Sequence, residues 1–234
     1  MPPSPSRRAA AAFVVLVFAG ACRTAPQVAV APASPETGPV VPTQPATPSD
    51  ALFAARARAD SLRNPYVAAD VAFMQGMIGH HAQAIAMARL APTQGAAAAV
   101  RTLAARIINA QGDDIALMQN WLRDRGQEVP EANPLGMKMR MDGMEHMMLM
   151  PGMLSAAQMQ ELAAARGEAF DRLFLTYMIQ HHQGAVSMVQ RLFATDGAGQ
   201  DDVVFKFASD VNVDQTTEIA RMQLMLLQLA ASGG

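Results

Sequence analysis

The chain has 234 residues, of which 51% are hydrophobic and 16% are charged, and its formal net charge is -2 at pH 7. Charges of both signs are interspersed along the chain, so the sequence predicts no basic surface and no nucleic-acid partner. Cys22 is the single cysteine, which excludes an internal disulfide and requires a packed core for stability.

The first 22 residues have the pattern of a signal peptide. Two arginines precede an apolar run over residues 9–18, which is shorter than the roughly 20 residues of a transmembrane helix. The small residues Ala19–Ala21 then precede Cys22, as in the lipobox of bacterial lipoproteins. The sequence therefore predicts export to the periplasmic side of the cell envelope, with Cys22 as a lipid anchor to the membrane. Cleavage near Ala21 without lipidation is the alternative.

Residues 23–50 are rich in proline, alanine and threonine and carry almost no charge. Regularly spaced prolines prevent a helix, so we expect an extended, disordered tether. From residue 51 to residue 234 the composition changes to Ala, Leu, Met, Gln and Arg, with apolar residues at three- and four-residue spacings. This part is predicted to be one all-α domain.

Five helices are predicted in this domain. Asn64 and Pro65 are expected to start the first helix, which Pro92 ends after Ala91. Ser155 and Gln158 form a capping-box pattern at the start of a short helix. The remaining long helices are expected at about 96–125, 168–194 and 201–231.

The long helices contain an internal repeat. Eight residues of the first recur at one constant offset in the third: Asp70, Phe73, Met77, Ile78, His80, His81, Ala84 and Met87 correspond to Asp171, Phe174, Met178, Ile179, His181, His182, Ala185 and Met188. The helix that follows each of them repeats as well. Two helical hairpins, at about 65–125 and 156–232, would pair most simply into a four-helix bundle joined by a long connector over residues 126–155.

The repeated histidines lie on or beside the apolar stripe of each helix. The partner helices place amides and carboxylates on their own apolar faces, and these should orient the imidazoles, together with the two repeated aspartates: Gln111, Asp114, Gln215, Glu218, Asp70 and Asp171. In one interpretation His81 and His182 are neutral core residues that these groups satisfy. In the other, the imidazoles bind a metal ion.

The ligand types favour a soft metal. Helical bundles that hold hard cations use Glu-x-x-His, whereas this chain has Met77-x-x-His80 and Met178-x-x-His181, with Met87 and Met188 further along the same edges. Thioether sulfur and imidazole suit Cu(I) or Ag(I). The nearby carboxylates mean that Zn and Cu(II) remain alternative metal ions.

The connector is unusually rich in methionine. Its candidate metal ligands are Met137, Met139, Met141, Met144, Met147, Met148 and His146. A flexible apolar loop packed on the bundle is one interpretation, because methionine fills irregular gaps. The alternating Met-x-Met-x-Met pattern favours a soft-metal binding segment in an extended conformation.

Residues 73–87 and 170–188, with their two His-His pairs, and the lead-in at residues 151–155 resemble the bacterial family called domain of unknown function 305. The resemblance covers the chain from Pro65 to its end. It implies a ferritin-like four-helix fold and relates the chain to periplasmic proteins that bind copper or silver. In the first repeat Gly79, Ala82 and Gln83 depart from the residues usual around the family's histidines.

The leading hypothesis is therefore an envelope protein that sequesters or delivers a soft metal, most of all Cu(I), in metal tolerance or homeostasis. The sequence has no glycine-rich phosphate loop and no nucleophile elbow, so nothing in it requires an enzyme. A ferritin-like oxidase and a metal-free structural or partner-binding bundle are the alternatives. Oligomerisation is left open.

Overall fold

The computed structural model describes residues 52, 55–56, 59, 65–141 and 144–232. Residues Pro45–Gly234 form one compact unit, to which all the described residues belong. The signal segment, Cys22 and the tether lie outside the described residues. No helix in the described part of the chain is both long enough and apolar enough to cross a lipid bilayer.

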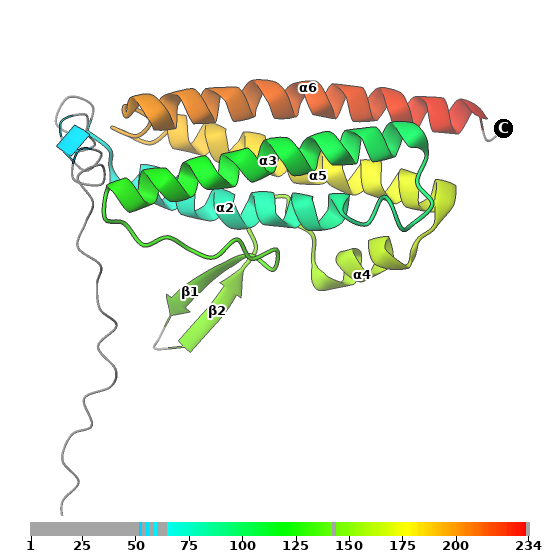
Figure 1. The fold of residues 1–234 in the computed structure, drawn as a ribbon, viewed down its shortest axis with the longest axis horizontal. Helices are drawn as coiled ribbons and strands as arrows, with labels where there is room; N and C mark the ends of the chain where they lie inside the picture. The colour runs from blue at the N-terminus through cyan, green and yellow to red at the C-terminus, as the bar shows by residue number, and fades with distance from the viewer. Residues whose placement is uncertain (1–51, 53–54, 57–58, 60–64, 142–143, 233–234) are drawn as a thin grey trace, which may run out of the picture. The chain divides into compact units, whose positions relative to one another are not determined.

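Five helices make up most of the described structure and confirm the all-α fold class (Figure 1). The four long ones are α2 (Ala68–Ala88), α3 (Ala98–Asp124), α5 (Gly167–Phe193) and α6 (Asp202–Ser232), and α4 (Ala156–Ala164) is the short one. Helix α2 packs against α3, α5 packs against α6, and α2 contacts α5. Each repeat is therefore a helical hairpin, and the two His-His helices meet each other.

The short helix starts as the sequence predicts, whereas α2 does not. The Ser155 hydroxyl accepts a hydrogen bond from the Gln158 backbone N–H at the start of α4. Helix α2 begins at Ala68 and not at Pro65, because the Asp70 carboxylate accepts the Val67 backbone N–H (2.8 Å) and closes the first turn there. It ends at Ala88, before a run of turns.

The connector contains two strands, which were not predicted from the sequence. Strands β1 (Met137–Met141) and β2 (Met144–Met148) form a two-stranded antiparallel hairpin, and β1 contacts α2. The alternation of methionine with polar residues has the period of two that suits a strand. Figure 1 shows the hairpin beside the helices rather than between them.

The rest of the connector lies along α2. The Gln83 amide donates to the carbonyls of Pro134 (3.0 Å) and Leu154 (3.1 Å), and its oxygen accepts the Leu154 backbone N–H (2.6 Å). Gly184 of α5 leaves room for the backbone of Pro151, with which any Cβ at that position would collide. Helix α2 is thus covered by the connector as well as by α3 and α5, which explains why most of its residues are buried.

The core consists of two apolar clusters. One contains Phe73, Trp121 and Phe207, and the other contains Leu103, Phe170 and Phe174. Along α2 the first cluster ends at Ile78 and the second begins at Ala84. The histidine pairs occupy the layer between these clusters.

Candidate metal centre

Four fully buried histidines form the middle layer of the bundle: His80, His81, His181 and His182. The rings of His80 and His181 come together across the contact between α2 and α5, with centroids 3.8 Å apart and planes inclined by 41°. Within each pair the neighbouring rings are 6.3 Å apart. The repeat therefore produces a symmetric cluster of imidazoles in which the two inner rings are in contact.

The outer histidines are held by carboxylates of the partner helices. His81 Nε2 donates to Asp114 Oδ2 (3.1 Å), and His182 Nε2 donates to Glu218 Oε2 (2.8 Å). The two carboxylates are partly exposed, at 35% and 20% of their side-chain surface, while both rings are fully buried. A carboxylate on one ring nitrogen fixes the tautomer and leaves the other nitrogen with its lone pair.

The inner histidines have fewer partners. His80 Nε2 lies 3.1 Å from the Pro151 carbonyl oxygen, which can only accept, so this nitrogen carries the proton. Neither ring nitrogen of His181 makes a hydrogen bond of good geometry among the described residues, although the His80 backbone is close enough to offset slightly the lowering of the His181 pKa by burial, and the Nδ1 atoms of the other three histidines also lack such a bond. Buried polar atoms without partners cost stability and are uncommon in native proteins. The unpartnered Nδ1 atoms of the other three histidines carry lone pairs, and the neutral ring of His181 has one lone pair and one N–H, so each ring has one nitrogen that can bind a metal.

Burial keeps the inner imidazoles neutral. Desolvation, followed by the charge of His81, lowers the pKa of His80 from 6.5 to about 3. Desolvation, followed by the charge of His80, lowers the pKa of His181 well below 6.5. Only a neutral imidazole can coordinate a metal, so both rings are in the binding form at neutral pH.

Thioether sulfurs surround this layer. Met77, Met178 and Met87 are fully buried, and Met188 is 9% exposed. A Cβ placed on Gly76, one helical turn before His80, would lie 3.1 Å from the Met150 sulfur and 3.5 Å from the Met188 methyl group. Both methionines line a shallow surface hollow of about 290 Å³, together with Pro151.

The two amides predicted to face the histidines are buried on the partner helices. Gln111 and Gln215 are each 4% exposed, and the side-chain oxygen of each has no hydrogen-bond partner among the described residues. They line a cleft of about 390 Å³ between α3 and α6, together with Asp114 and Glu218.

The repeated aspartates have a different place from the one expected. Asp70 accepts the backbone N–H groups of Val67 (2.8 Å) and Gly199 (2.7 Å), and Asp171 accepts that of Ala97 (3.1 Å). Each carboxylate thus ties the start of a histidine helix to a turn or helix start in the bundle. These bonds to backbone donors account for both residues without a metal.

Across the described residues, no three His, Cys, Asp or Glu side chains are arranged to hold a metal ion by themselves. Methionine sulfurs and glutamine oxygens, which are not among these side chains, can also bind metal ions. Imidazole nitrogens with free lone pairs beside thioethers match the donor preference of Cu(I) and Ag(I), and they fit a hard cation poorly.

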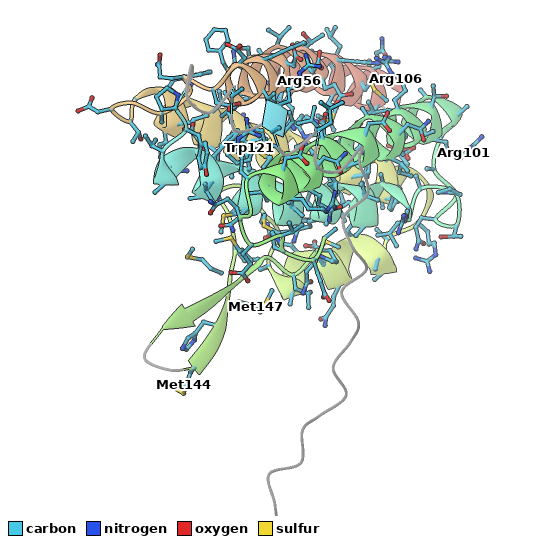
Figure 2. The ribbon with its side chains drawn as sticks, turned by 60° about the vertical axis from the view of Figure 1, so that its left-hand side comes forward. Arg56, Arg101, Arg106, Trp121, Met144 and Met147 are labelled. Carbon is cyan, nitrogen blue, oxygen red and sulfur yellow. The ribbon has the colours of Figure 1, made fainter. Side chains whose placement is uncertain are left out.

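The hairpin carries a second group of soft donors. Its register pairs Met137 with Met148, Met139 with His146 and Met141 with Met144. Because alternate residues of a strand share a face, these six positions belong to one face of the hairpin. Met144, Met147 and Met148 are 62%, 42% and 41% exposed, and Figure 2 shows Met144 and Met147 on the hairpin.

Three residues of this centre were missing from the predicted ligand set. Pro151 contacts His80, and Met150 lies beside Gly76, only because the connector folds back over α2, and such long-range contacts cannot be predicted from sequence spacing. Gly76 gave a weak signal, since a glycine inside a helix costs about 1 kcal/mol relative to alanine and usually makes room for a neighbour.

The chain is similar to proteins of known structure. The described fold resembles a candidate secreted protein from Streptomyces coelicolor (27% identity, 69% of this chain and 94% of that chain, TM-score 0.58). It also resembles a fragment from Deinococcus radiodurans (30% identity, 70% and 99%, TM-score 0.57). Both of these structures are described as domain of unknown function 305 proteins.

A third similar structure is CopM in its Cu(II)-bound form (29% identity, 68% of this chain and 96% of that chain, TM-score 0.53). CopM has also been solved with Cu(I) and with Ag. A search of curated proteins gave no match. The family model for domain of unknown function 305 matches residues 70–226, which include both hairpins and the connector, and this chain belongs to that family.

Proposed function

We propose that this protein binds Cu(I) or Ag(I) in the cell envelope and sequesters or delivers it. The observation that carries the proposal is the buried imidazole layer, in which His80 keeps a free Nδ1 and His181 makes no hydrogen bond of good geometry through either nitrogen among the described residues. His80, His181, Met150 and Met188 would supply the ligands. The metal would be the cargo of the protein.

The hydrogen bonds around the layer support this assignment. Histidines that ligate metals commonly donate their second ring nitrogen to a carboxylate or a backbone carbonyl, which orients the ring and raises its basicity. His81 and His182 have carboxylate partners, and His80 has the Pro151 carbonyl. These partners would also satisfy a structural core, so the support for a metal comes from the second ring nitrogens, which they leave without a partner.

The comparison with CopM supports the choice of metal. That protein was crystallised with Cu(I), Cu(II) and Ag, and this chain shares its fold at 27–29% identity. The methionine-rich hairpin adds thioethers, which bind Cu(I) and Ag(I) and have little affinity for Zn or Mn. We propose that the hairpin binds further Cu(I) or Ag(I) at the surface.

Cu(II) and Zn are the second candidates for the bound metal ion. The carboxylates of Asp114 and Glu218 beside His81 and His182 favour them, since nitrogen and oxygen donors suit these ions. An oxidase has less support, because the bundle core lacks, in the part described, the glutamate-rich ligand set of di-iron proteins.

The decisive experiment is an anaerobic titration of the purified protein with Cu(I) against a competing chelator, with Ag(I) and Zn titrated in parallel. We expect tight uptake of Cu(I) and Ag(I) and weaker uptake of Zn. Oxygen consumption on copper loading would instead support an oxidase. The absence of uptake of any of these metals would leave a structural bundle.

The envelope part of the proposal rests on the signal segment and Cys22. A lipid chain at Cys22 would hold the domain at the membrane, and export agrees with the secreted character given for the Streptomyces coelicolor relative. Cys22→Ser should move the protein from the membrane fraction to the soluble fraction of the cell envelope. Unchanged fractionation would exclude the lipid anchor and leave the signal peptide.

A further inference from the structure

A cleft between α3 and α6 lies directly over the outer histidines. Its volume is about 390 Å³, and its polar walls come from corresponding parts of the two repeats. Helix α3 contributes Gln111 and Asp114, and α6 contributes Gln215 and Glu218. Asp210 and Asp214 complete the acidic lining on the α6 side.

The cleft has an excess of negative charge. Four carboxylates line it, whereas Arg106, labelled in Figure 2, is the one cationic residue in the described lining. Lys206 lies outside the lining and pairs with Asp210 (2.6 Å). Partial burial, followed by the like charges of Asp210, Glu218 and Asp114, raises the pKa of Asp214. The carboxylates are thus close enough to repel one another, and a cation between them would relieve that repulsion.

A second observation points to a cation independently of the charge. The side-chain oxygens of Gln111 and Gln215 are buried beside the cleft without a hydrogen-bond partner among the described residues, and each residue is 4% exposed. An amide oxygen is a neutral acceptor that binds cations or their hydration water. An unpartnered acceptor at equivalent positions of both repeats is costly, and rotation of each amide would bring its covered oxygen to an ion in the cleft.

The carboxylates at the floor of the cleft connect it to the imidazoles. Asp114 and Glu218 are partly exposed to the cleft, and each also accepts a hydrogen bond from a fully buried histidine. An ion in the cleft would therefore be one side chain away from His81 or His182. The inner rings of His80 and His181 follow in the same layer.

We propose that the cleft between α3 and α6 is the entrance through which metal cations reach the histidine layer. Its carboxylates would concentrate cations, and the amide oxygens of Gln111 and Gln215 would replace part of their hydration. The inference rests on the proposed function and adds a route to it. The methionine-lined hollow at Met150 and Met188 has no carboxylate in its lining and is the competing entrance.

The test measures the rate of silver uptake by the full-length protein in chloride-free buffer at low ionic strength. Ag(I), added as nitrate, is followed by stopped flow with a silver-responsive dye. The hairpin methionines are replaced by leucine in every variant, so that uptake reports the bundle. Asp210→Asn with Asp214→Asn removes two charges from the cleft without touching a histidine. The matched control, Glu131→Gln with Asp196→Asn, removes two exposed charges elsewhere.

We expect the cleft variant to take up silver about tenfold more slowly than the parent, because clefts of one charge raise the association rates of ions by 10–10³-fold. The uptake rate of the cleft variant should also depend less on the salt concentration. The control variant should keep the parental uptake rate and stoichiometry. Gln111→Leu with Gln215→Leu should also slow uptake, although it removes two unsatisfied oxygens and should not destabilise the fold.

Two results would contradict the proposal in different ways. Equal uptake rates in the cleft variant, the control and the parent would exclude the cleft as the entrance and leave the proposed function intact. Slower uptake after Ala72→Phe, which would narrow the methionine-lined hollow without changing a proposed ligand, would assign the entrance to that hollow. Failure of the parent to bind silver would overturn the proposed function, and the entrance with it.

Discussion

The histidine layer and the methionine hairpin present soft donors in opposite environments. In the layer the imidazoles are fully buried, and the Nδ1 atoms lack hydrogen-bond partners within the described structure. On the hairpin, Met144 and Met147 are exposed, at 62% and 42%. Burial makes a site rigid and slow to enter, and exposure makes it accessible and weak. We propose that the layer holds the metal most tightly and that the hairpin binds further metal at the surface.

The largest expected effect comes from removing the inner imidazoles. His80→Leu with His181→Leu should weaken Cu(I) binding by more than about 100-fold, because loss of an orienting partner alone typically costs 10–100-fold. The melting temperature should change little, because the loss of the His80 hydrogen bond to the Pro151 carbonyl opposes the gain from removing ring nitrogens that lack partners. Competition titration and calorimetry measure the two effects. Parental Cu(I) affinity in this variant would show that the rings only fill the core.

The acid sensitivity of the metal-free protein should also come from the layer. The pKa of His80 is about 3 in the folded protein and 6.5 when unfolded, so between these values the unfolded chain binds more protons. The free energy of unfolding is therefore unaffected by His80 above pH 6.5 and decreases as the pH falls from 6.5 toward 3. The lowered pKa of His181 changes the free energy of unfolding in the same direction. Chemical unfolding from pH 7 to pH 4 should show this loss, and the double leucine variant should show a flatter profile.

A smaller effect is expected at the Met150 thioether, which lies beside Gly76. Gly76→Ala would bring a methyl group 3.1 Å from the Met150 sulfur, and we expect Cu(I) affinity to fall up to about tenfold as the sulfur moves. Helix propensity favours alanine by about 1 kcal/mol, so the fold should not weaken much.

Gly112→Ala is the matched control for that change. Gly112 lies inside α3, and a Cβ there meets nothing within 4 Å. It should gain the same helix propensity and keep the parental Cu(I) affinity. A similar loss of affinity in both variants would remove Met150 from the ligand set.

The smallest effect on the core should come from the hairpin. Met144→Leu with Met147→Leu and Met148→Leu changes exposed side chains, so stability should stay within about 0.5 kcal/mol of the parent. The total Cu(I) bound at saturation should fall, while the tightest site keeps its affinity. Unchanged capacity in the titration would show that the hairpin methionines do not bind metal.

The sequence predicted the parts of the bundle that follow from periodicity. Residues three and four apart share a helix face, so the repeated stripes already placed His81 near Asp114 and His182 near Glu218. The all-α class and the capping box at Ser155 follow from equally local signals. These features can be predicted from local sequence alone, because they do not depend on contacts between distant segments.

The remaining parts depend on long-range contacts. Pro151 reaches His80 and Met150 reaches Gly76 across more than seventy residues of chain, through a connector whose path no local pattern encodes. Asp70 was expected to orient a histidine, but the turn at Gly199 reaches its carboxylate and uses it as a cap. The hairpin strands escaped notice because methionine alternation was interpreted as ligand spacing and not as strand geometry.

The central claim is that the first Cu(I) equivalent binds in the histidine layer through imidazole and thioether together. X-ray absorption at the copper edge, on protein loaded anaerobically with one equivalent, measures those ligands directly. We expect both nitrogen and sulfur neighbours, and we expect the signal to persist in the hairpin leucine variant. Sulfur neighbours alone, or their disappearance in that variant, would contradict the claim and place the metal on the hairpin.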